Sequence, residues 1–381
     1  MASNELCFTV LGSSGAGKTT MLACMQRKFD EILPGSIIAD RAAFSTLTLA
    51  YRKLEEEANS SELEFGVGIE NTENLREYGF TITAGRANIP MKFWDFPGGW
   101  IDSARNSKEN YERVIRIVKR SRVIFVAVNT PYLMEANGRW RKEARIDDTS
   151  YVLKNALIDG NDNKLVLILP IKCEKYTRNP ALQKRMYAVI EEAFADILSL
   201  ANNPVYRKRL AIAVLPIHTV GNATFSRFEH QEGGRLPREV YLKNRGAGFG
   251  PKYADQPLRY AMSFLLNEYA RGGDYVINDS FSRADFKELC AFIRGGMEID
   301  NGLFKFYSGR EMVTDAAEIK IVPAPPVRKE PPPVPIKQQD ETGHVFLWIV
   351  IIVLVVIIVI LLSRPPEVRV QTFWEWVWSL F

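Results

Sequence analysis

Near its amino terminus the chain reads Gly12-Ser13-Ser14-Gly15-Ala16-Gly17-Lys18-Thr19, which matches the pattern G-x-x-x-x-G-K-[ST] at every fixed position. A strand-like run, 6–11, precedes it, and a stretch of helical period, 19–28, follows it. In this context glycines let the chain turn so that successive backbone N–H groups face one anionic volume at a helix amino terminus. The stretch predicts a phosphate-binding loop made of all eight residues and Thr20. The alternative is a glycine-rich turn that carries a lysine by chance.

A second pattern, 91–98, reads MKFWDFPG and ends in Asp-x-x-Gly. Asp95 at the end of an extended run can hold a Mg²⁺-bound water, and Gly98 can offer its N–H to a γ-phosphate. In the loop, Lys18 would reach the β- and γ-phosphates, and the Thr19 hydroxyl would complete the Mg²⁺ shell. The two patterns together predict a nucleotide site that also binds Mg²⁺.

Short β-rich runs alternate with stretches of helical period up to about residue 271. The predicted strands are 6–11, 78–84, 91–95, 122–128, 164–170 and 209–217. Two of them are apolar on both faces, as central parallel strands are when helices cover each side. Helical stripes at 182–200 and 258–269 would supply that cover. We expect an α/β fold, a three-layer P-loop NTPase sheet with flanking helices, plus one C-terminal transmembrane helix.

The domain organisation follows from changes in composition along the chain. Residues 1–271 form the predicted P-loop domain, with insertions at about 31–77, which has helical period around 51–57, and 221–251, a Gly- and Arg-rich surface loop. The remaining segments are a helical extension at 272–322, a Pro-rich linker at 323–344, a transmembrane helix at 345–362 and a short aromatic tail at 363–381.

The carboxyl-terminal span rests on 18 apolar residues, 345–362, about 27 Å as a helix. Seven prolines between 323 and 335 favour an extended, semi-rigid spacer before it. Three tryptophans after the span suit a membrane interface. We expect a tail-anchored, single-pass membrane protein whose amino-terminal domain faces the cytosol, where nucleotides and Mg²⁺ are found. A buried soluble helix is the alternative.

On these motifs the chain resembles the P-loop GTPases of the TRAFAC class, the Ras-like and translation-factor-like proteins, in divergent form. The resemblance covers about 5–271 by order of elements and is specific at the P-loop and at Asp95–Gly98. It implies a switch threonine that closes on Mg²⁺, and Thr72, 23 residues before Asp95, holds that position. Thr81 and Thr83 compete for this role but lie inside the predicted strand 78–84, and the alternative for Thr72 is an ordinary loop residue. In outline the chain is also similar to bacterial double-GTPase-like families, although only one such domain is present.

The base-recognition motif departs from that family. Where the family has Asn-Lys-x-Asp, this chain has Ile171-Lys172-Cys173-Glu174. The resemblance gives Lys172 a stem along the base and Glu174 the N1–H and N2–H groups of guanine, but Ile171 offers no amide. Thr219 lies where the family places a short loop against the base. We expect Mg²⁺ with GTP, and ATP as the less favoured nucleotide.

The residue after Asp-x-x-Gly also differs. Ras-like proteins have there a glutamine that orients the attacking water, whereas this chain has Gly99. Hydrolysis should therefore be slow, and no residue is assigned a catalytic role. Trp100, the next residue, is expected to pack in the core.

Composition restricts the alternatives. The net charge of +4, from 49 basic and 45 acidic residues, gives no reason to expect a nucleic-acid partner. Four widely spaced cysteines and three histidines argue against a disulfide framework or a zinc site.

Two function hypotheses remain. The first is a membrane-anchored, Mg²⁺-dependent GTPase that acts as a switch or assembly module. The second is a membrane-tethered scaffold that binds nucleotide structurally and recruits a protein through its Pro-rich linker.

Overall fold

The computed structural model describes residues 6–32, 37–65, 74–84, 87–101, 107–135, 138, 140–158, 160–229, 237–244, 246–270 and 283–314. The chain divides into two units, Met1–Val322 and Pro323–Phe381, and all described residues belong to the first. Thr72 and the predicted span at 345–362 lie outside the described residues.

One eight-stranded sheet forms the centre of the first unit, in the order β11-β8-β7-β6-β1-β5-β4-β2. Its strands are β1 (Leu6–Leu11), β2 (Ile37–Ala39), β4 (Arg76–Ala84), β5 (Ala87–Asp95), β6 (Val123–Asn129), β7 (Lys164–Ile171), β8 (Leu210–Val214) and β11 (Lys305–Ser308). The five strands from β5 to β8 in this order run parallel, and β2, β4 and β11 join by antiparallel pairing. The carboxyl ends of the central strands therefore share one edge, where ligands bind in open α/β sheets.

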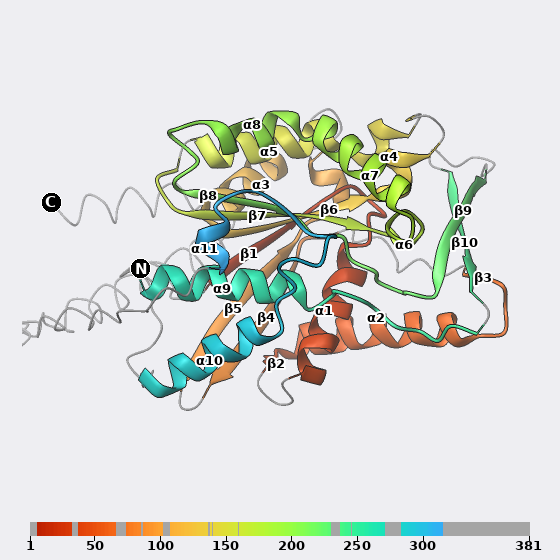
Figure 1. The fold of residues 1–381 in the computed structure, drawn as a ribbon, viewed down its shortest axis with the longest axis horizontal. Coiled ribbons are helices and arrows are strands. Elements are labelled where there is room, and N and C mark those ends of the chain that lie inside the picture. The colour runs from red at the N-terminus through yellow and green to blue at the C-terminus, as the bar shows by residue number, and fades with distance from the viewer. Residues whose placement is uncertain are drawn as a thin grey trace, which may run out of the picture. The chain divides into compact units, whose positions relative to one another are not determined.

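Helices cover both faces of this sheet, which gives three layers (Figure 1). One face carries α1 (Lys18–Ile32), α2 (Arg41–Asn59), α9 (Gln256–Ala270) and α10 (Arg283–Gly295). The other carries α3 (Lys108–Arg120), α5 (Ile146–Ile158), α7 (Pro180–Ala193) and α8 (Ala195–Asn202). Successive side chains of a strand point to opposite faces, so each strand contributes to both cores. Phe8 of β1, for example, stacks on Phe93 of β5 in the first core, with ring centroids 4.5 Å apart.

The expected three-layer α/β arrangement is confirmed, and the six predicted strands are all present within a few residues of their expected bounds. The strands predicted at 78–84 and 91–95 are β4 and β5, which pair antiparallel in register from Arg76 to Ala84. The helical stripe at 182–200 is two helices, because the run breaks at Phe194 between α7 and α8.

The prediction of a surface loop at 221–251 is wrong. This segment contains β9 (Ala223–Glu229) and β10 (Arg238–Lys243), which pair antiparallel and are joined by β3 (Glu64–Phe65) in a second, three-stranded sheet. Few apolar residues occur in the segment, but pairing across the chain supplies the backbone hydrogen bonds that a loop would take from water. In Figure 1 this sheet lies beyond the ends of the central strands.

The other insertion is also more ordered than its pattern indicated. Residues 31–77 provide β2, the whole of α2 and β3, so the helix predicted around 51–57 extends over 41–59. Asp40 caps α2, accepting from the Ala43 amide at 2.7 Å, and accepts from Gly79 of β4 at 2.9 Å. The first insertion is thereby fastened to the edge of the large sheet.

Shorter elements complete the described part of the chain. They are η1 (Gly98–Ile101), α4 (Thr130–Met134), η3 (Arg141–Ala144), α6 (Glu174–Thr177) and α11 (Arg310–Thr314).

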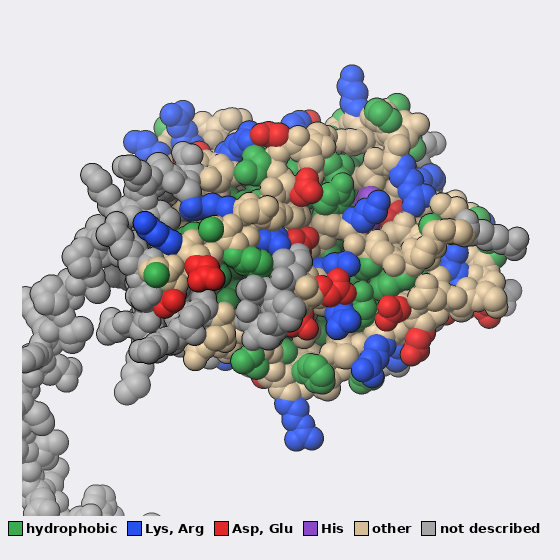
Figure 2. All heavy atoms as spheres, turned by 60° about the horizontal axis from the view of Figure 1, so that its bottom comes forward, with side chains coloured by type: hydrophobic (Ala, Val, Ile, Leu, Met, Phe, Trp, Pro, Cys, Tyr) green, Lys and Arg blue, Asp and Glu red, His purple; other side chains and the backbone are tan. Residues whose placement is uncertain are grey.

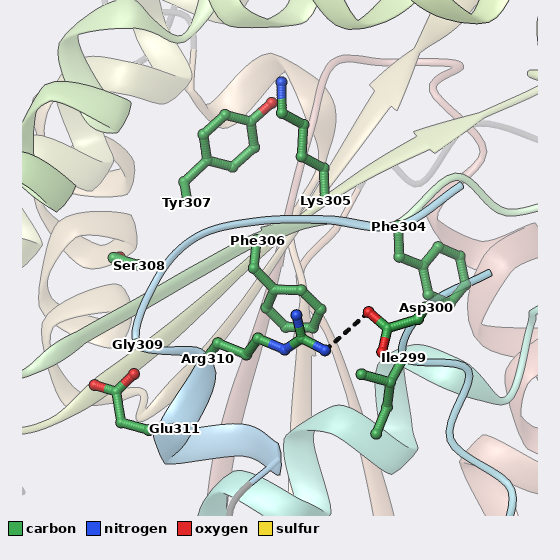
Figure 3. Close-up of a pocket in the computed structure, with 10 residues that line it drawn as sticks. All are labelled: Ile299, Asp300, Phe304, Lys305, Phe306, Tyr307, Ser308, Gly309, Arg310 and Glu311. Carbon is green, nitrogen blue, oxygen red and sulfur yellow. Dashed lines mark hydrogen bonds and ion pairs between the residues drawn. The ribbon is translucent and has the colours of Figure 1, made fainter. Parts of the chain in front are cut away.

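Beside the edge strand β11, a hollow of about 400 Å³ is lined by residues 299–300 and 304–311, with Arg310 paired to Asp300 at 2.9 Å (Figure 3). It shares no residue with the predicted nucleotide site.

Two further features concern the surface and the helices of the described residues. On the face drawn in Figure 2, Lys and Arg side chains are interspersed with Asp and Glu. No helix in the part of the chain that the structure describes has the length and apolar character to cross a bilayer.

Candidate functional site

The P-loop joins the end of β1 to the start of α1 at the carboxyl edge of the sheet. Gly12, Gly15 and Gly17 all have positive φ, the conformation that glycine adopts without strain. Gly12 also lies against β6, because a Cβ there would come within 2.4 Å of the Ala127 carbonyl oxygen. The Lys18 ammonium is buried and donates to the carbonyls of Gly12 and Ser13 at 3.1 and 3.0 Å. The loop therefore folds around its lysine.

The predicted metal ligands Thr19 and Asp95 meet. The Thr19 hydroxyl, in the first turn of α1, donates to Asp95 Oδ2, at the end of β5, over 3.0 Å. Asp95 is fully buried, and its Oδ1 has no hydrogen-bond partner among the described residues. A hydroxyl and an underused buried carboxylate are oxygen ligands of the kind that Mg²⁺ prefers, so the residues fit the ion. The third predicted ligand, Thr72, stays a prediction.

Within the described ranges no group of three or more His, Cys, Asp and Glu side chains is placed to hold a metal. A site of the kind proposed here draws only one carboxylate and one hydroxyl from these residues. Mg²⁺ commonly binds through one or two carboxylates and takes further ligands from water and substrate phosphates. Such a ligand set would leave the remaining positions around an ion to water and phosphate oxygens.

Gly98 follows Asp95 and lies directly on the P-loop. A Cβ at Gly98 would come within 2.0 Å of the Ser14 backbone nitrogen, which is too close for any side chain. Only glycine therefore allows the turn after β5 to approach the loop that would hold phosphates. Gly99 is exposed, and a Cβ there would meet nothing within 4 Å. Trp100 is partly buried against the second core, as its predicted packing role requires.

Burial governs the electrostatics of this cluster. Burial lowers the pKa of Lys18, with the charge of Asp95 acting in the opposite direction. Burial likewise raises the pKa of Asp95, although the Lys18 charge and the Thr19 hydrogen bond oppose the change. Both shifts disfavour the charged form, as expected for groups removed from water. Polyanionic phosphates beside Lys18 would favour the charged form of Lys18, and a cation beside Asp95 would favour the charged form of Asp95.

The predicted base-side residues follow β7. Lys172 has a positive φ of 59° and reaches back to the P-loop, where its ammonium donates to the Gly15 carbonyl at 2.8 Å. The structure thus brings Lys172 to the P-loop, and its place along a base stays a prediction. The position of the family's asparagine is apolar here: Ile171 is buried beside Gly17 of the P-loop, where an added Cβ would lie 3.4 Å from the Ile171 Cγ2.

Glu174 begins α6 and is buried against the loop that contains Thr219. Its Oε1 accepts from the backbone amides of Val220 and Gly221 at 3.3 and 3.4 Å. Burial raises the pKa of Glu174, and these backbone hydrogen bonds oppose the change. Glu174 therefore supports the 218–221 loop, and its contact with guanine stays a prediction. The Thr219 carbonyl accepts from Cys24 of α1 at 3.3 Å, which ties the same loop to the P-loop helix.

Sequence reasoning missed two polar residues next to Lys172. Glu239 of β10 accepts from the Lys172 ammonium at 2.5 Å and from the Asn129 amide at 2.5 Å. Asn129 ends β6 and is the register partner of Ile171. The available sequence signal was the alternation of apolar and polar residues from Ala223 to Ser226 in β9, the strand that pairs with β10.

Comparisons with known proteins assign no family. No protein-family model and no curated protein matches the chain. Among solved structures, the signal recognition particle receptor SRb-GTP/SRX complex from Chaetomium thermophilum is similar at 12% identity and TM-score 0.34, over 57% of this chain and 92% of that one. The GTP-bound Ski7 GTPase-like domain of S. cerevisiae is similar at 13% identity and TM-score 0.32, over 56% of this chain and 43% of its own.

A bacterial selenocysteine-specific elongation factor, EF-Sec, is similar at 12% identity and TM-score 0.28, over 56% of this chain and 26% of its own. This chain therefore spans less than half the length of two of these three structures. At these TM-scores the likeness does not assign a function.

Replacing Lys18 tests the phosphate site. Lys18→Ala removes the ammonium that the P-loop encloses, and a charge-assisted contact contributes about 1.5–3 kcal/mol. We expect nucleotide affinity to fall roughly tenfold to more than a hundredfold, measured by calorimetry on the purified full-length protein with Mg²⁺. Lys28→Ala, a partly exposed lysine of the same helix paired to Glu31, is the matched control. Unchanged binding by Lys18→Ala would refute the assignment.

Proposed function

We propose that the chain is a membrane-anchored, Mg²⁺-dependent GTP-binding protein that hydrolyses GTP slowly and acts as a switch or assembly module at a membrane. The observation that carries the proposal is the convergence of Lys18, Thr19 and Asp95 at the carboxyl edge of the sheet, within a glycine loop that encloses the lysine. These three residues come from the two motifs that the nucleotide hypothesis requires.

Each residue would have a distinct role in binding. The loop amides and Lys18 would neutralise the phosphates, while Thr19 and Asp95 would hold Mg²⁺, which would supply further positive charge to the phosphates. Gly98 lies against the P-loop backbone at Ser14, close to where phosphates would be held. A switch at Gly98 would respond to the presence of a γ-phosphate.

The choice of GTP over ATP rests on Lys172 and Glu174. Lys172 is already held across the P-loop, so its stem can form one wall of a base site. Glu174, two residues after Lys172, carries a buried carboxylate. Guanine offers two N–H donors to a carboxylate, whereas adenine offers none at the same positions. The apolar Ile171 weakens this selectivity, so ATP remains the second candidate nucleotide.

The alternative function is a membrane-tethered scaffold that binds nucleotide without efficient hydrolysis. Gly99 favours it, because an exposed glycine offers no side chain to orient a water. In this alternative the Pro-rich segment at 323–335 would recruit a protein that recognises polyproline II helices.

Membrane attachment is proposed from the sequence of 345–362. At about −0.4 kcal/mol for each Val, Ile or Leu, the run contributes on the order of −7 kcal/mol to insertion, with no charge that opposes it. The proposal places the nucleotide domain in the cytosol as a single-pass, tail-anchored protein.

Replacing Glu174 tests base selection. Glu174→Ala should weaken GTP binding by a larger factor than ATP binding, because adenine has no N1–H or N2–H to lose. Glu174→Gln keeps an oxygen for the Val220 and Gly221 amides but turns a donor toward guanine, so it should reproduce the GTP-specific loss with the loop intact. Equal losses for both nucleotides in calorimetry would reduce Glu174 to a support of the loop.

Single-turnover hydrolysis distinguishes the two functions. With Mg²⁺ present and the full-length protein in excess over GTP, we expect a hydrolysis rate of about 10⁻³ s⁻¹ or slower, since no glutamine follows Asp-x-x-Gly to orient the water. Lys18→Ala serves as the control for contaminating hydrolases and should show no turnover. Binding without any turnover above that control would favour the scaffold.

Removing the tail tests the anchor. Truncation before Gly343 should release a soluble protein that still binds nucleotide, and Ile352→Arg should weaken insertion in part, since a charge at the span centre costs about 2.5–3.5 kcal/mol. The measurement is sedimentation with membranes after carbonate extraction, followed by calorimetry of the soluble fraction. Continued sedimentation of the truncated protein, or loss of nucleotide binding, would contradict the anchor.

A further inference from the structure

The three-stranded sheet extends into the candidate nucleotide site through one side chain. Glu239, on its central strand β10, contacts Lys172 and Asn129, which end or follow the neighbouring strands β7 and β6 of the large sheet. Tyr241, two residues further along β10, donates its hydroxyl to the same carboxylate. Three donors therefore converge on Glu239 from two separate sheets.

The Lys172–Glu239 ion pair is largely buried. The side chains are 23% and 10% exposed, and the Tyr241 ring centroid lies 5.8 Å from the Lys172 ammonium. Burial would raise the pKa of Glu239, but the charge of Lys172 and the three hydrogen bonds outweigh it, and the pKa is lowered. Glu239 is therefore a charged acceptor in a setting that excludes most water.

Lys172 connects this carboxylate to the P-loop. Its ammonium donates to Glu239 and to the Gly15 carbonyl, so one nitrogen joins β10 to the loop that would hold phosphates. The positive φ of Lys172 fixes where the side chain starts, and the two acceptors fix where it ends. The stem between them is consequently held in one place.

The strand that carries Glu239 is itself anchored. β10 pairs with β9 on one side and with β3 on the other. Lys243, at its end, donates to the carbonyls of Glu57 and Ser60, where α2 ends. The carboxylate is therefore presented by a supported strand.

We propose that Glu239 is a positioning residue for the nucleotide, holding the Lys172 stem across the P-loop as one wall of the base and ribose site. The proposal rests on the nucleotide-binding function proposed above. It also assigns a role to the added sheet, which would supply from β10 the polar support that Ile171 cannot give.

Two effects of removing Glu239 have opposite signs. Loss of a charge-assisted contact frees the Lys172 stem and should weaken binding of any nucleotide that packs on it, by roughly tenfold to a hundredfold for Glu239→Ala. Loss of a negative charge alone would instead strengthen binding, and more so for each additional phosphate. The dependence on phosphate number therefore separates positioning from simple electrostatics.

The test compares GMP, GDP and GTP binding by calorimetry for the full-length protein, Glu239→Ala and Glu239→Gln. We expect Glu239→Ala to lose the same factor for all three nucleotides, and Glu239→Gln, which retains an acceptor oxygen, to lose less. In a Lys172→Met background the Glu239→Ala effect should shrink to less than twofold, because Glu239 acts through Lys172. A loss of equal size in that background would show a structural role only and overturn the proposal.

Glu64→Ala is the matched control, since Glu64 lies on β3 of the same sheet and pairs with Arg227 at 3.0 Å without contacting Lys172. An equal loss in Glu64→Ala, no loss in Glu239→Ala, or a gain that increases with phosphate number would each overturn the proposal. If Glu239→Ala does not fold, the same comparison with Glu239→Gln decides. If the unaltered protein and Lys18→Ala bind nucleotide equally or not at all, the nucleotide function itself fails.

Discussion

The buried Lys18 ammonium and Asp95 carboxylate are the constraint on which the site depends, because a buried charge is costly unless it is paired and hydrogen-bonded. Lys18 is met by two P-loop carbonyls, and Asp95 by the Thr19 hydroxyl. These contacts require the loop to curl over its own lysine and β1 to lie between β5 and β6. The positive-φ glycines and the parallel register of these strands therefore position the same two charges.

The central part of the fold could be predicted because each of its elements has a local signal. The runs at 123–128 and 165–169 are apolar on both faces, a pattern that suits strands covered by helices on both sides. The edge strands β2 and β11 are three and four residues long and carry polar or exposed positions, so periodicity could not find them. Their pairing comes from neighbours already in place in the sheet.

The residues of the site also divide into those with a local sequence signal and those without one. The P-loop, Asp95 and Gly98 lie in contiguous motifs, whereas Glu239 is 67 residues from Lys172 and 110 from Asn129. No local pattern links residues that distant, and the segment around Glu239 reads as a polar loop because half of its strand residues face away from any core. Its order comes from pairing β10 with β3, which lies some 175 residues earlier and belongs to the other insertion. The two insertions become one sheet only in three dimensions.

That sheet changes what supports the base side of the site. In the family that the chain resembles, an asparagine precedes the lysine, whereas here the neighbouring position is the buried, apolar Ile171. The amide of Asn129, the register partner of Ile171, is bound to Glu239, so support for Lys172 comes from a strand outside the large sheet. If nucleotide binding depends on Lys172, linkage requires reciprocity: whatever stabilises the placement of β10 tightens nucleotide binding, and bound nucleotide stabilises β10 by the same free energy. A partner that engages the three-stranded sheet would then regulate nucleotide affinity without touching the nucleotide.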